Sequence, residues 1–141
     1  MLKTIVVALD GLELAERVIL TLQELIVPEP SKVILCHVFP PPDVEREVLA
    51  DRPHPESAEV SYLHIEKQLR SYQQELSVST EVELVTGDPA EEIIRLANIY
   101  QADLIVIGSR GLTGMKRIVQ GSVSSQVVED AACSVLVVKP K

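Results

Sequence analysis

Short apolar runs alternate along the chain with longer segments in which apolar residues recur every three or four positions. Five of the short runs are rich in β-branched and aliphatic residues, which predicts strands at 5–9, 33–38, 80–85, 104–107 and 135–138. Runs that are apolar on both faces are typical of strands buried between two layers of helices. The third run alternates instead, with Val82 and Leu84 on one face and Glu81 and Glu83 on the other.

The segments between these runs predict helices with one buried face. Their apolar stripes are Leu14, Val18, Leu22 and Leu25; then Ala58, Tyr62, Ile65, Leu69, Tyr72 and Leu76; then Ala90, Ile93, Ile94 and Ala97. The third of these helices has a clear start signal, because Asp88 can cap it, Pro89 suits its first position and Glu91 can close a capping box. A last helix is expected to begin near Gly121 and Ser122 and to carry Val123, Val127 and Val128.

The alternation of strands and helices predicts the fold class. A β-α-β-α-β-α-β-α-β order is typical of an α/β fold with one open, parallel sheet, right-handed crossovers and helices on both faces. We expect a single Rossmann-like domain over residues 1–141 with the strand order 3-2-1-4-5. Ligands of such sheets bind outside the carboxyl ends of the strands, where the strand order reverses.

Composition and charge narrow the class of partner. The formal net charge of −8 argues against nucleic acids and anionic membranes, which need a basic surface. No apolar run approaches the roughly 20 residues that a membrane span needs, and the amino-terminal apolar stretch is too short for a signal peptide. A cytoplasmic protein is therefore expected. Cys36 and Cys133 are expected to behave as small hydrophobic residues, and His37 as a partly buried, hydrogen-bonded residue of the second strand.

The residues that could bind a ligand cluster after the fourth predicted strand. Glycines recur at Gly108, Gly111, Gly114 and Gly121, and the cationic residues Arg110, Lys116 and Arg117 lie among them on an otherwise acidic chain. Glycine lets backbone amides approach an anion closely, and the helix that follows Ser122 would add free N–H groups and the positive end of its dipole. This pattern predicts a phosphate-binding loop, although three glycines after a strand could also simply shape a surface turn.

Other nucleotide motifs and metal sites are absent from the sequence. The glycine spacing is not the GxGxxG of dinucleotide folds, and no GxxxxGK[ST] supplies a Walker lysine. His54 and His64 have no Cys or Glu at metal-ligand spacing, so no metal site made by protein alone is expected. Mg²⁺ could accompany a nucleotide through its phosphate oxygens.

The glycine spacing, together with the rest of the chain, resembles one family. Gly108-x2-Gly111-x9-Gly121-Ser122 is similar to the ATP-binding signature of the nucleotide-binding branch of the universal stress proteins. The segments KTIVVALDG, ILCHV, ADLIVIGSRG and GSVSSQVVEDAACSVLVVK resemble that family's first, second and fourth strands and its last helix and strand. The resemblance implies the fold of the adenine nucleotide alpha hydrolases and an ATP, ADP or AMP ligand.

The resemblance also implies roles for individual residues. Asp10 matches the acidic residue near the ribose and base, although Asp10 alone fits a loop-capping role equally well. Val38 matches the position whose backbone meets adenine. Phosphate and ribose contacts fall on Gly108, Gly111, Gly121 and Ser122, with Ser124 as a small hydroxyl one turn into the helix. The complete predicted site is Ala8, Asp10, Val38, Ile107, Gly108, Arg110, Gly111, Gly121, Ser122, Val123 and Ser124.

Function and assembly follow as expectations. The sequence favours a nucleotide-binding regulatory protein of the stress response without catalytic residues, because nothing evident positions a water for attack on phosphate. Two alternatives stay open: a slow ATPase or nucleotidyl-transfer enzyme on the same fold, and an interaction module without a ligand. A homodimer is expected through the fifth strand, Val135, Leu136, Val137 and Val138, whose apolar edge would otherwise be unpaired.

Overall fold

A computed structural model describes residues 3–9, 12–25, 31–39, 55–108 and 123–139. Five parallel strands form one sheet in the order β3-β2-β1-β4-β5, so the predicted strand order is confirmed. The strands are β1 (Thr4–Ala8), β2 (Lys32–Phe39), β3 (Ser79–Thr86), β4 (Leu104–Gly108) and β5 (Ser134–Val138). The helices are α1 (Leu12–Glu24), α3 (Pro55–Glu75), α4 (Pro89–Ile99) and a helical segment at 123–130.

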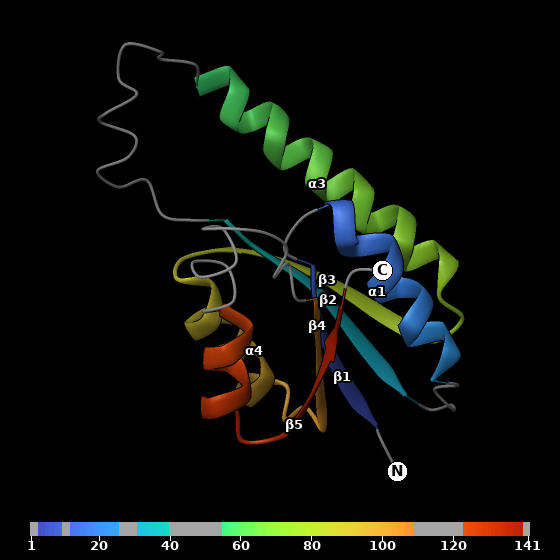
Figure 1. Ribbon diagram of the computed structural model, residues 1–141. Helices are drawn as coiled ribbons and strands as arrows, with labels where there is room; N and C mark the ends of the chain where they lie inside the picture. The colour runs from blue at the N-terminus through green and yellow to red at the C-terminus, as the bar shows by residue number, and fades with distance from the viewer. Residues whose placement is uncertain (1–2, 10–11, 26–30, 40–54, 109–122, 140–141) are drawn as a thin grey trace.

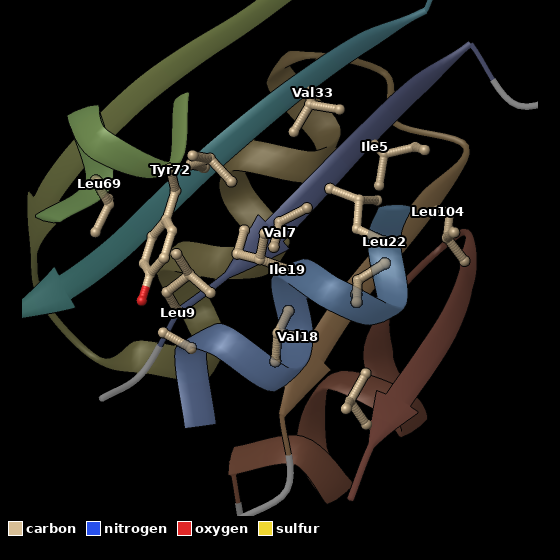
Figure 2. Packing of buried hydrophobic residues seen from close by; sticks show 14 residues of the cluster. Ile5, Val7, Leu9, Val18, Ile19, Leu22, Val33, Leu69, Tyr72 and Leu104 are labelled. Atoms are coloured by element: carbon tan, nitrogen blue, oxygen red, sulfur yellow. The ribbon is translucent and has the colours of Figure 1, made fainter. Parts of the chain in front are cut away.

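Helices cover both faces of the sheet (Figure 1). On one face, α1 and α3 pack against the strands through residues that include Val18, Leu22, Leu69 and Tyr72 (Figure 2). On the other face, α4 and the helix at 123–130 bury Ala90, Ile93, Leu96, Ala97 and Val127. The strand residues between these two cores, such as Val6 and Ile105, are fully buried, as expected for runs that are apolar on both faces.

Asp88 caps the start of α4, as predicted. Asp88 is the N-cap residue and its carboxylate accepts a hydrogen bond from the backbone N–H of Glu91 at 3.1 Å. Pro89 occupies the first turn, where its missing N–H costs nothing. These contacts fix the point at which the chain leaves β3 and turns back over the sheet.

Among the described residues, three members of the predicted apolar stripes are exposed. Leu25 follows the end of α1 and is 40% exposed, because the helical face that would have buried it stops at Glu24. Val128 is 52% exposed, since it lies about 100° around the helix from the buried Val127. Tyr62 is 43% exposed on α3, where it stacks on Phe39.

The two edge strands differ in chemistry. Glu81 and Glu83 of β3 are in register with Ile34 and Cys36, and the Tyr100 hydroxyl lies within hydrogen-bond distance of both carboxylates. Lys32 Nζ lies 2.7 Å from Glu81, and these hydrogen bonds hold the pKa of Glu81 below its usual value. Charges turned toward the sheet face are one way in which proteins block an edge from pairing with another strand.

The other edge, β5, carries no such charges on its described residues. Its residues from Val135 to Val137 are half-buried and Val138 is buried, and within the described sheet β5 pairs only with β4. The prediction that the fifth strand is an edge strand with apolar residues on both faces is therefore confirmed.

The described residues show neither a membrane-spanning helix nor a cluster of metal ligands. None of the helices in the described part of the chain has the length and hydropathy that crossing a bilayer requires. Across the same residues, no group of three or more His, Cys, Asp or Glu side chains gathers where a metal ion could be held.

Candidate functional site

A cavity opens at the carboxyl ends of the central strands, on the side of the sheet that α4 covers. It measures about 270 Å³, with the open solvent at its mouth included. Its lining residues are all uncharged: Ala8, Leu9, Cys36, Val38, Pro89, Ile93, Ile107 and Val123. Within the described residues, this is an apolar recess in which a ligand would meet aliphatic side chains and backbone groups.

Strand register builds the floor of this cavity. Ala8 of β1 pairs with Cys36 of β2 on one side and with Ile107 of β4 on the other. The three residues therefore form one row across the sheet, and the small alanine side chain at the centre leaves room above it. The sheet order reverses between β1 and β4, so the cavity lies at the switch point where α/β sheets bind ligands.

Two helices form the walls. Pro89 and Ile93 belong to the first turns of α4, whose cap places them beside the ends of β1 and β2. Val123, the first described residue of the last helix, is half-buried and forms another part of the wall.

Cys36 lines the cavity as a neutral thiol and supplies no reactive thiolate. Its side chain is fully buried, and that burial, followed by the nearby charge of Glu83, raises the pKa of the thiol to about 12. A thiol with such a pKa stays protonated at neutral pH, so the expectation that Cys36 behaves as a small hydrophobic residue is consistent with its surroundings.

The structure brings four predicted site residues together. Ala8, Val38, Ile107 and Val123 all line the cavity. Ser124 is buried with 8% of its surface exposed, but it is not among the described residues that line the cavity. Asp10, Arg110, Gly111, Gly121 and Ser122 lie outside the described residues.

Gly108 has a packing role that sequence reasoning missed. A Cβ atom at this position would lie 2.5 Å from Leu14 Cδ2 and 3.0 Å from Leu14 Cγ on α1. Its φ is not in the left-handed region; among described glycines that conformation is seen at Gly87, whose φ is +153°. Glycine at 108 therefore lets α1 approach the end of β4 closely.

Four lining residues were not predicted. Cys36 could have been found by extending the alternation from Val38 back along its strand, and Leu9 because it directly follows Ala8 at the carboxyl edge. Pro89 and Ile93 gave no such signal, because their place at the cavity depends on which strands α4 crosses.

Comparison with known proteins adds a family match. The chain matches the model of the universal stress protein family over residues 1–139. The universal stress protein Sll1388 of Synechocystis is 33% identical over 96% of both chains. A universal stress protein of Methanocaldococcus jannaschii, MJ0531, is 44% identical over a shorter stretch, which is 52% of this chain and 43% of that protein.

Solved structures show the same fold. The structure of Methanocaldococcus jannaschii MJ0577 superimposes with a TM-score of 0.82 at 30% identity, covering 100% of this chain and 98% of the other. Three universal stress proteins solved with cAMP, with AMP (from Arabidopsis thaliana) and with dAMP (from Archaeoglobus fulgidus) have TM-scores of 0.70, 0.68 and 0.66. They are 22%, 24% and 24% identical, and each alignment covers at least 97% of this chain and 92% of the other.

Proposed function

The chain belongs to the universal stress protein family, and from this premise we propose that it is a regulatory protein of the stress response that binds an adenine nucleotide, ATP or ADP. The observation that carries the proposal is the apolar cavity at the switch point of the sheet, bordered by Ala8, Val38, Ile107 and Val123. All four belong to the site that the sequence predicts.

The lining of the cavity favours the base as its occupant. Its described walls are apolar side chains, and none of them carries a charge. Apolar walls suit the faces of a purine ring, whereas they would desolvate phosphate groups without compensation. We therefore place adenine in the cavity and the ribose and phosphates outside it.

The phosphates would then be bound by the glycine-containing segment after β4. Ile107 ends the cavity floor one residue before Gly108, which opens this segment. Gly111, Gly121 and Ser122 supply the proposed phosphate contacts, and Arg110 the nearby positive charge. Support for an adenine nucleotide also comes from the three relatives of the same fold that hold cAMP, AMP and dAMP.

Mg²⁺ would bind through the nucleotide. The described lining of the cavity offers no carboxylate, and Mg²⁺ prefers oxygen ligands and retains several of its waters. We propose that the phosphate oxygens hold the ion if it accompanies ATP.

We propose binding without efficient turnover, in the cytoplasm. Hydrolysis needs a group that positions water against the γ-phosphate. The described lining residues offer no general base, because Cys36 stays protonated and the others carry no titratable group. Asp10 would lie toward the ribose by its resemblance to the family's acidic residue.

Mass spectrometry of the purified protein, followed by calorimetric titration, tests this function. We expect ATP or ADP to be retained or to bind, with GTP binding more weakly, and ATP hydrolysis far below roughly 1 s⁻¹. Turnover of several per second that is lost in Asp10→Ala would favour the enzyme instead. A folded protein that binds none of ATP, ADP, AMP and cAMP would favour the interaction module.

We also propose that two copies pair through β5. Antiparallel pairing of Val135, Leu136, Val137 and Val138 with the same strand of a second copy would satisfy the edge N–H and C=O groups and bury half-exposed side chains. The charges of Glu81 and Glu83 make the opposite edge, β3, unsuited to the same contact.

Val137→Lys is expected to shift the protein from dimer toward monomer. The dissociation constant of the dimer should rise at least about tenfold, because the interface would bury the lysine ammonium group away from water. Sedimentation equilibrium at micromolar concentration measures the shift. Val128→Lys, an exposed position outside the strand, serves as the control. A monomeric wild type, or a Val137→Lys variant that stays fully dimeric, would rule out this interface.

A further inference from the structure

A histidine side chain forms a hydrogen bond with a backbone carbonyl at the end of β1. His37 Nδ1 lies 2.6 Å from the carbonyl oxygen of Leu9. A carbonyl oxygen can only accept, so Nδ1 carries a hydrogen and donates it. The backbone N–H of Leu9 donates in turn to the carbonyl of Cys36 at 2.9 Å. Both polar groups of Leu9 are therefore held by neighbouring residues of β2.

This contact lies where the β1–β2 ladder stops. The register ends with Ala8 opposite Cys36, and Leu9 follows β1. The His37 ring thus fixes the direction of the first carbonyl beyond the paired residues. Leu9 is 3% exposed, so its carbonyl would have little water to replace a lost donor.

Leu9 also borders the nucleotide cavity. Its side chain packs in the core between the sheet and α1 and α3, on the face opposite the cavity. The part of Leu9 that can line the cavity is therefore its backbone. A change in the tilt of this peptide group would alter the wall of the cavity beside Ala8.

Two aromatic rings hold His37 in place. The ring of Phe39 meets His37 edge to face, with centroids 4.6 Å apart and an angle of 75°. Tyr62 of α3 stacks on Phe39 at 5.4 Å and 23°. A row of three rings thus runs from the partly exposed surface of α3 to the Leu9 carbonyl.

We propose that His37 is a positioning residue for nucleotide binding: by donating from Nδ1 to the Leu9 carbonyl, it fixes the backbone wall of the cavity, and Phe39 and Tyr62 fix His37. The inference rests on the proposed function. It assigns to His37 a role in affinity that is separate from its contribution to the core, since the ring lies on the face of the sheet opposite the cavity.

Three variants separate the two roles. His37→Phe keeps an aromatic ring but removes the donor, and ATP affinity should fall about tenfold. His37→Asn places an amide N–H where Nδ1 lies, so it should restore affinity to within about threefold of wild type. Val33→Ala removes bulk from the same face of β2 at its other end; it should lower the melting temperature and leave affinity unchanged.

Calorimetric titration with ATP, thermal unfolding, and nitrogen NMR of the His37 ring provide the readouts. We expect the NMR signals of a ring that carries a hydrogen at Nδ1. We also expect His37→Phe to lose more ATP affinity than Val33→Ala, even where the two variants lose the same stability. Equal affinity of wild type and His37→Phe would overturn the inference and leave the proposed function standing. A wild type that binds no adenine nucleotide would overturn both.

Discussion

Val123→Phe is expected to weaken ATP binding at least about a hundredfold and to leave the fold intact. Val123 is half-buried at the side of the cavity, where a larger ring would occupy the space that we assign to adenine. A hundredfold loss corresponds to about 2.7 kcal/mol, which is the order expected when roughly 100 Å² of apolar surface on the base is no longer buried. Calorimetric titration with ATP measures the loss, and circular dichroism checks the fold.

Val128→Phe is the matched control for this substitution. Val128 lies on the same helix but is 52% exposed and does not line the cavity. The control should bind ATP like the wild type. If Val123→Phe also binds normally while folded, the base does not occupy this cavity, and the assignment of Ala8, Val38 and Ile107 fails with it.

Gly108→Ala is expected to reduce the free energy of unfolding by about 2 kcal/mol. The new Cβ would lie 2.5 Å from Leu14 Cδ2 and 3.3 Å from Val18 Cγ2, so the Leu14 side chain or α1 itself must shift away from β4. Overpacking of this kind typically costs about 1–3 kcal/mol. Urea unfolding monitored by circular dichroism gives the value.

A double-mutant cycle with Leu14→Ala tests the cause of this loss. Leu14→Ala alone removes partly buried bulk and should destabilise the protein, but it also makes room for the methyl group that Gly108→Ala introduces. The two changes together should therefore cost clearly less than the sum of the single changes. Additive costs would show that the contact with Leu14 is not what requires glycine at this position.

Patterns along the chain were enough to predict most of the fold. Four continuous apolar runs and one alternating run predicted the five strands, and the cap signal at Asp88 and Pro89 predicted the start of α4. The stripes failed at Leu25 and Val128, because periodicity describes a face of a helix but not where the helix ends or how far its neighbours cover it.

Less of the candidate site than of the fold could be predicted from the sequence. Ala8, Val38 and Ile107 were placed through the resemblance to the universal stress proteins, and each is the last or next-to-last residue of its strand. Pro89 and Ile93 could not, since the crossing of α4 over β1 and β2 depends on packing between distant segments. The glycine at 108 was assigned to anion binding, whereas its contact with Leu14 appears only when α1 is placed against β4.

The unequal edges of the sheet bear on how far assembly by strand addition can proceed. An edge such as β3, with Glu83 turned toward the sheet face and bonded to Tyr100, disfavours the addition of a further strand. Under the pairing that we propose, each chain would then have a valence of one, through β5. Monovalent units stop at a pair, so raising the protein concentration would complete dimers without seeding filaments, and a substitution that made β3 apolar would give each chain two joining ends and allow polymers to grow.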